Sequence, residues 1–248
     1  MMFPPQDIWN VDELPEAARA ALRQNEAASE QTTFALLLDS ESMAARGYAL
    51  EIYSLLQADT RWGVEFQLTA FNDRIHEEAV RLLEAHPLAA GESGALVAEA
   101  NHASALRVMW AVAKPDDLHH LLRSLRTAST PLTQDRAARA ALFWLQRWPD
   151  RPPEFGAAMR ALVENTDIAR SARCTAMRCL SVYRGPESEA VLLEASLDPD
   201  LQIATNAAWV LTRLDLEKHR AHLEALVDVW GDDPPYLGEE VREALGIV

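Results

Sequence analysis

A helical pattern with one small residue at its centre recurs at nearly even intervals in the C-terminal half of the chain. The central residues are Ala141, Ala176, Ala208 and Ala244, which lie 35, 32 and 36 residues apart. A period of this length is typical of a repeat made of two short helices. The small residue suits a close crossing of helices, because a larger side chain would hold them apart. The pattern therefore predicts an all-α fold of stacked helix pairs.

The apolar stripes around these alanines define the second helix of each pair. We expect these second helices near residues 135–148, 167–182, 201–214 and 237–245. The first helices are expected at 116–127, 153–164, 186–196 and 217–230. Upstream, we expect first helices at residues 12–28 and 73–86. A helix at 93–113 should pair with the one at 73–86, and a further apolar stripe runs from Asp39 to Leu55. About six pairs result.

The expected buried stripes share helical spacing and small or apolar side chains. They comprise Ala45, Tyr48, Ala49, Ile52 and Leu55; Ala138, Ala141, Leu142, Leu145 and Trp148; Ile168, Ala172, Ala176 and Cys179; Ala204, Ala207, Ala208, Leu211 and Leu214; and Leu237, Val241, Ala244 and Leu245.

The sequence predicts one domain over residues 1–248, with clear repeats from about 115 to 248 and degenerate repeats in 1–114. Residues 62–71 depart from the pattern, since Val64, Phe66 and Leu68 alternate as in a strand. A lone strand would have no partner in a stack of helices. We therefore favour a helix or an irregular segment there, and the choice among helix, strand and loop stays open.

Two segments resemble the second-helix signature of HEAT repeats. They are residues 198–211, Asp-Pro-Asp-Leu-Gln-Ile-Ala-Thr-Asn-Ala-Ala-Trp-Val-Leu, and residues 240–246, Glu-Val-Arg-Glu-Ala-Leu-Gly. The resemblance implies a right-handed α-α superhelix. It says little about activity, because HEAT-like proteins include scaffolds, inhibitors, lyases and a few enzymes.

Composition restricts the compartment and the class of partner. No apolar run reaches the roughly 18 residues that a membrane span needs, and the N-terminus lacks the pattern of a signal peptide. Cys174 and Cys179 lie about 140° apart on a helix and cannot easily pair, which favours a reducing cytoplasm. The net charge of −15 disfavours a general nucleic-acid binder, whose affinity comes from neutralising phosphates.

The charge is divided into zones along the chain. Residues 1–119 carry a net charge of −11, residues 120–184 carry +6, and residues 185–248 carry −10. The basic zone contains the arginines that we select as candidate partner-binding residues: Arg136, Arg139, Arg170, Arg173 and Arg178. Two interpretations remain open. These arginines either pair with neighbouring carboxylates on a solvated face, or form a basic band that binds a protein partner.

The sequence predicts no metal, cofactor or catalytic residue. His219 and His222 share a helix face, but no further ligands stand out, and His119 and His120 point about 100° apart on a helix. Deoxyhypusine hydroxylases, which are HEAT-like, use several His-Glu dipeptides, whereas only His76 here is followed by glutamate. HEAT-like DNA glycosylases use Trp and Asp, for which the counterparts would be Trp144, Trp148, Asp150 and Trp209. Packing between repeats is the simpler role for Trp144 and Trp148.

Together these features favour a non-enzymatic protein-binding module. Within that class we expect a bacterial inhibitor or immunity-type protein that occludes a toxin or enzyme, because a strongly acidic chain captures a basic partner rapidly. Two alternatives stay open. One is a HEAT-like enzyme, either a DNA alkylpurine glycosylase or a chromophore lyase, and the other is a scaffold in a larger assembly.

Overall fold

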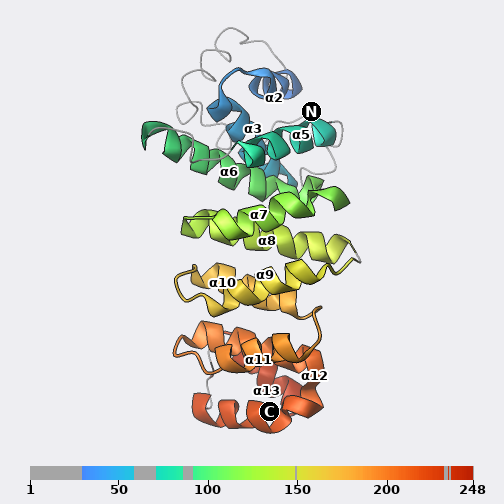
Figure 1. Ribbon diagram of the computed structural model, residues 1–248, viewed down its shortest axis with the longest axis vertical. Helices are drawn as coiled ribbons and strands as arrows, with labels where there is room; N and C mark the ends of the chain where they lie inside the picture. The colour runs from blue at the N-terminus through green and yellow to red at the C-terminus, as the bar shows by residue number, and fades with distance from the viewer. Residues whose placement is uncertain are drawn as a thin grey trace. The chain divides into compact units, whose positions relative to one another are not determined.

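The computed structural model describes residues 30–58, 71–85, 92–148, 150–231, 234 and 236–247. Every regular element in these ranges is helical, which confirms the predicted all-α class. Figure 1 labels them. The helices are α2 (Glu30–Asp39), α3 (Met43–Ala58), α5 (Asn72–Glu84), α6 (Glu92–Val112), the 3-10 helix η5 (Pro115–Asp117), α7 (Leu118–Thr127), α8 (Pro131–Arg147), α9 (Pro153–Glu164), α10 (Arg170–Leu180), α11 (Pro186–Ala195), α12 (Leu201–Trp230) and α13 (Gly238–Leu245).

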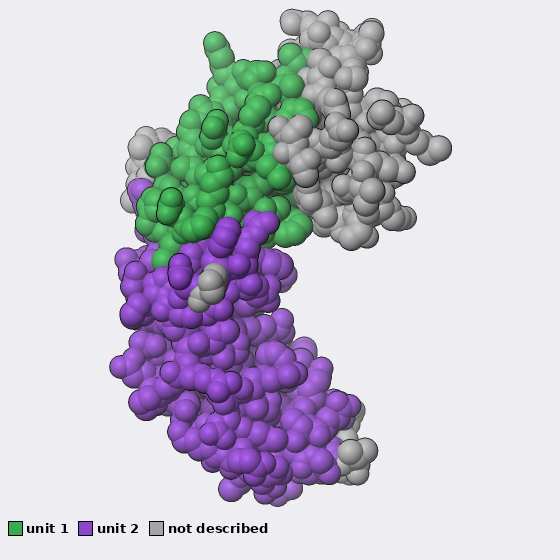
Figure 2. Space-filling view, turned by 90° about the vertical axis from the view of Figure 1, so that its right-hand side faces the viewer, with its two compact units in different colours: residues 1–121 green, residues 122–248 purple. Residues whose placement is uncertain are grey.

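The contacts within the chain group it into two compact units, residues 1–121 and 122–248, which Figure 2 colours green and purple. The boundary falls within α7. The expectation of one domain over residues 1–248 stays a prediction. None of the described helices combines the length and apolar character needed to cross a membrane.

In unit 1, α6 packs against both α3 and α5, and α2 packs against α3. The expected helices at 73–86 and 93–113 correspond to α5 and α6. Helix α2 was not expected, and the helix expected at 12–28 and the segment 62–70 lie outside the described residues. Helices α3 and α6 approach closely at Gly47, where an added Cβ would lie 2.0 Å from the side-chain oxygen of Asn101. A glycine at this position therefore permits the close crossing.

Buried polar contacts hold the helices of unit 1 together. Arg46 Nε donates a hydrogen bond of 2.9 Å to Glu78, which joins α3 to α5, and both residues are buried. His76 Nε2 lies 2.8 Å from the carboxylate of Asp117, which joins α5 to η5. Burial alone would raise the pKa of the Asp117 carboxyl, but hydrogen bonds from His76 and from the backbone N–H of Lys114 outweigh it and keep that pKa below its ordinary value.

In unit 2, helix pairs follow one another in successive layers (Figure 1). Helix α10 contacts α8, α9 and α12, while α11 contacts α9 and α12. Prolines fix where three of these helices begin, because Pro131, Pro153 and Pro186 each occupy the first helical position, where a missing N–H costs nothing. The Thr130 side chain caps α8 by accepting a hydrogen bond from the N–H of Thr133.

Helix α12 contains two of the expected helices joined without a loop. Its backbone leaves helical geometry only at Asp215, where φ is −163° and ψ is 92°. The Asp215 carboxylate accepts a hydrogen bond of 3.1 Å from the N–H of Lys218 and so caps the second half. The expected segments 201–214 and 217–230 are therefore present, with a single residue as the joint between them.

The recurring small residue is buried in three of its four positions. Ala141, Ala176 and Ala208 have no exposed surface. The expectation for Ala244 is wrong, since it is exposed. Helix α13 contacts α12 through Val241 and Leu245, and Ala244 lies on the order of 90° around the helix from the centre of that buried face.

Enlarging a central alanine tests the close crossing. Ala176→Leu should lower the free energy of unfolding by about 1–3 kcal/mol, because the added carbons have no space between α8, α10 and α12. Urea denaturation followed by circular dichroism measures this. Ala161→Leu, on the exposed side of α9, is the control and should change stability little. Equal stability of the two variants would contradict the crossing.

Candidate functional site

The five arginines selected from the sequence have different environments. Arg139 Nε lies 2.8 Å from the carboxylate of Asp135, one turn earlier on α8. Arg170 Nε lies 2.8 Å from the carboxylate of Asp200, the N-cap residue of α12. Arg136 is half-buried on α8 and also has an interaction partner. Arg139 and Arg170 therefore pair with neighbouring carboxylates.

Arg173, selected as a candidate partner-binding residue, is buried. It is 9% exposed. Its Nε donates a hydrogen bond of 3.0 Å to the carbonyl of Val163, and its Nη2 donates one of 3.1 Å to the carboxylate of Asp198. Arg173 therefore ties α10 to the end of α9 and to the turn before α12. The long side chain allows an arginine on a buried part of α10 to reach polar groups.

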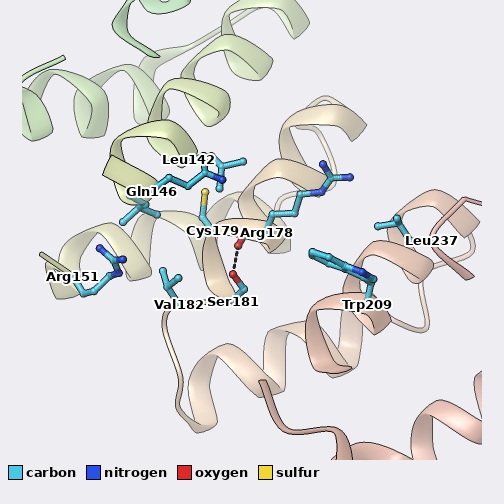
Figure 3. A pocket seen from close by; sticks show the side chains of 10 residues that line it. Leu142, Gln146, Arg151, Arg178, Cys179, Ser181, Val182, Trp209 and Leu237 are labelled. Atoms are coloured by element: carbon cyan, nitrogen blue, oxygen red, sulfur yellow. Dashed lines mark hydrogen bonds between the residues drawn. The ribbon is translucent and has the colours of Figure 1, made fainter. Parts of the chain in front are cut away.

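Arg178 lines a hollow of about 460 Å³ on the face of unit 2 where the second helices lie side by side (Figure 3). The hollow is bordered by the C-terminal half of α8, the end of α10 and the first half of α12. The lining residues are Leu142, Leu145, Gln146, Arg151, Arg178, Cys179, Ser181, Val182, Trp209 and Leu237. We call it the arginine hollow.

Arg151 and Arg178 line this hollow and give it a positive charge, and Arg213, which does not line it, adds positive charge beside Trp209. Arg178 Nε donates to the side-chain oxygen of Asn206 at 3.3 Å. Arg151 Nη1 donates to two backbone carbonyls, those of Trp148 and Asp150. The guanidinium of Arg213 lies over the Trp209 ring, 5.0 Å from its centre. Within the described residues no carboxylate forms an ion pair with any of the three, and no acidic residue lines the hollow.

Apart from Gln146 and Ser181, apolar groups form the rest of the surface. In Figure 3, Leu142, Cys179 and Val182 lie between Arg151 on one side and Arg178 with Trp209 on the other. Val182 is 42% exposed and Trp209 is half-buried, so both present apolar surface to a ligand. Such a surface suits a ligand that combines negative charge with an apolar group.

The hydroxyl and thiol groups of the hollow are poorly suited to nucleophilic chemistry. Ser181 Oγ donates a hydrogen bond of 2.7 Å to the carbonyl of Arg178. Burial raises the pKa of the Cys179 thiol far above its ordinary value. Cys174, which lies on the same helix, has its pKa raised to about 11 by burial, despite the opposing influence of Arg178. Thiols of this kind are unreactive at neutral pH.

The tryptophans compared with glycosylase residues differ in role. Trp144 is 3% exposed and stacks on Phe155 with ring centres 6.0 Å apart, so its predicted packing role is confirmed. Trp148 is half-buried at the end of α8, and Asp150 is exposed. Only Trp209 lines the hollow.

The histidines contact different neighbours. His219 Nε2 lies 3.7 Å from the carboxylate of Glu189, while His222 Nε2 lies 2.8 Å from Ser196 Oγ. Burial, followed by the nearby His219, lowers the pKa of His222. Across the described ranges, no three His, Cys, Asp or Glu side chains are grouped as a metal site would require.

Comparison of the chain with protein-family models, curated proteins and solved structures gives no match. The arginine hollow is therefore interpreted from its own geometry. Sequence reasoning selected Arg178, but it did not select Arg151 or Arg213. Arg151 lies in the connection between α8 and α9, where helical spacing gives no guide. Arg213 lies one turn after Trp209, and this spacing was the signal that could have predicted its contact with the Trp209 ring.

The buried ion pair of Arg173 predicts a large effect on stability. Arg173→Ala should lower the free energy of unfolding by about 3 kcal/mol, because the Asp198 carboxylate and the Val163 carbonyl lose their donor. Thermal unfolding measures this. Arg139→Ala removes an exposed pair and should cost less than about 1 kcal/mol. A small effect of Arg173→Ala would show that the side chain is not a structural tie.

The raised thiol pKa values predict slow chemical modification. At pH 8 a thiol with a pKa of about 11 is ionised in on the order of one molecule in a thousand. An aromatic disulfide reagent should therefore label the native protein slowly, and Cys174 before the more buried Cys179. In guanidinium chloride both thiols should react rapidly. The Cys174→Ser variant identifies which thiol of the native protein reacts first, because only Cys179 can be labelled in it. Rapid labelling of the native protein would contradict the buried, protonated state.

Proposed function

We propose that the chain is a non-enzymatic protein-binding module. The observation that carries this proposal is the arginine hollow, which combines cations that form no ion pair with the described residues, an accessible tryptophan ring and apolar surface. Arginine and tryptophan are the residues that most often dominate binding energy at protein interfaces. The thiol and hydroxyl groups lining the hollow are unactivated, which supports binding rather than chemistry at this place.

The architecture that we propose for the module is a HEAT-like right-handed solenoid of about six helix pairs. The alternation of first and second helices from α7 to α13 supports it, as does the burial of Ala141, Ala176 and Ala208 where second helices cross. In a stack of this kind the second helices share one surface, which suits the capture of an extended partner.

We further propose that the module is an inhibitor or immunity-type protein that occludes a toxin or enzyme in the bacterial cytoplasm. The net charge of −15 would accelerate encounter with a basic partner. The arginine hollow then offers the opposite charge at one point of the interface, where an acidic side chain of the partner fits. A partner that is basic overall and acidic at one point would be selected by both features.

Charge reversal in the hollow tests this function. The tagged wild-type chain, purified from its native host, should retain a protein at a fixed stoichiometric ratio. The double variant Arg151→Glu and Arg178→Glu should lose that protein, because both changes place negative charge where the partner carries it. Arg126→Glu, an exposed change on α7 that does not line the hollow, is the charge-matched control and should retain the partner.

Two results would reject the proposal. One is the recovery of no stoichiometric partner under conditions where the wild-type chain is folded. The other is tight, salt-sensitive binding of duplex DNA by the purified protein, which would favour the alternative of a HEAT-like DNA glycosylase. Retention of the same partner by the double variant would place the interface elsewhere on the chain.

A further inference from the structure

We propose that the arginine hollow recognises an acidic segment of a protein chain in which an apolar side chain lies between two carboxylates. This inference rests on the proposed protein-binding function and specifies the chemistry of the bound segment. It follows from the separation of the positive groups in the hollow and from the apolar surface between them.

The first positive end is the guanidinium of Arg151. Its Nη1 group is held by the carbonyls of Trp148 and Asp150, at 2.5 Å and 2.8 Å. These bonds fix the side chain in the connection between α8 and α9 and leave its remaining N–H groups available. An arginine that is oriented in advance loses less entropy when it binds a carboxylate.

The second positive end is formed by Arg178 beside Trp209. Asn206, which is 2% exposed, accepts a hydrogen bond from Arg178 Nε, and its own amide nitrogen donates to the carbonyl of Gln202 at 2.8 Å. Asn206 thus orients the guanidinium and leaves both terminal NH2 groups free to bind the two oxygens of one carboxylate. Arg213, over the Trp209 ring, adds positive charge at the same end.

The surface between the two ends is largely apolar, with Gln146 and Ser181 as its polar members (Figure 3). Leu142, Cys179 and Val182 lie there, with Arg151 on one side and Arg178 on the other (Figure 3). The volume of about 460 Å³ accommodates a few side chains and falls in the range of small-ligand sites. An aliphatic side chain placed on this surface would bury apolar area from both partners.

The same geometry disfavours other anions. A compact dianion such as phosphate offers no apolar group to the surface between Arg151 and Arg178 (Figure 3). A long polyanion would meet the acidic residues that give residues 185–248 a net charge of −10. Two separate carboxylates with an apolar group between them satisfy both ends and the surface that joins them.

Synthetic peptides test the inference on the full chain. Fluorescein-labelled peptides would carry two glutamates separated by one, two or three leucines within a Gly-Ser context. Fluorescence anisotropy should detect saturable binding of at least one spacing at concentrations below about 1 mM. Replacing both glutamates of that peptide by glutamine, or its leucines by serine, should weaken binding about tenfold or more.

Variants locate the binding in the hollow. Arg151→Gln and Arg178→Gln should each weaken binding of the best peptide about tenfold, because each removes one charged contact. Arg126→Gln is the matched control and should bind as the wild type does. Circular dichroism and thermal unfolding of each variant exclude loss of the fold as the cause, since Arg151 and Arg178 are exposed.

Four outcomes would overturn the inference. They are the absence of peptide binding to the folded wild type, equal binding of the glutamine peptide, wild-type affinity in both hollow variants, and displacement by inorganic phosphate at concentrations equal to those of the peptide. If the peptides fail while the chain still retains a stoichiometric protein partner, only the inferred segment chemistry is rejected. If the peptides bind but no protein partner exists, the proposed function is rejected instead.

Discussion

The close packing of the second helices at three alanines is the constraint on which unit 2 depends. Ala141, Ala176 and Ala208 have no exposed surface, and their lack of a long side chain lets α8, α10 and α12 come together. Residues next to these alanines are then brought onto one face of the unit. Leu142, which follows Ala141, and Trp209, which follows Ala208, line the arginine hollow. The candidate site is thus a direct product of the packing that forms the core.

Arginines on this unit divide into two groups according to what they contact. Arg139, Arg170 and Arg173 pair with carboxylates, so their charges are neutralised within the chain. Around the hollow, Arg151 and Arg178 instead contact neutral oxygens, and these bonds orient them without neutralising them. A cation that is held in place but not neutralised attracts an external anion more strongly than a flexible, paired one. In the hollow, two such cations border the same apolar surface.

Much of the fold could be predicted from the sequence because its signals are local. Prolines at 131, 153 and 186 and the spacing of apolar residues set most helices of unit 2 close to their observed bounds. Local signals failed where the outcome depends on neighbours. Ala244 is exposed because α13 rests on α12 through other residues, and Arg173 is buried because its partners, the Val163 carbonyl and Asp198, come from other elements. The hollow needed the fold as well, since Arg151 joins it from a loop.

The joint at Asp215 has a consequence for how this chain can vary and be cleaved. The other pairs of unit 2 are connected by several residues outside helices, whereas the two halves of α12 meet at one residue whose side chain also caps the second half. An inserted residue would separate that carboxylate from the N–H that it binds and would shift the register of the second half. A protease likewise finds no extended segment at this point, because cleavage requires several residues of accessible, unfolded backbone. Accepted insertions and proteolytic nicks should therefore concentrate in the connections between the other helices of unit 2, such as residues 165–169, 181–185 and 196–200, and the α12 joint should keep its length.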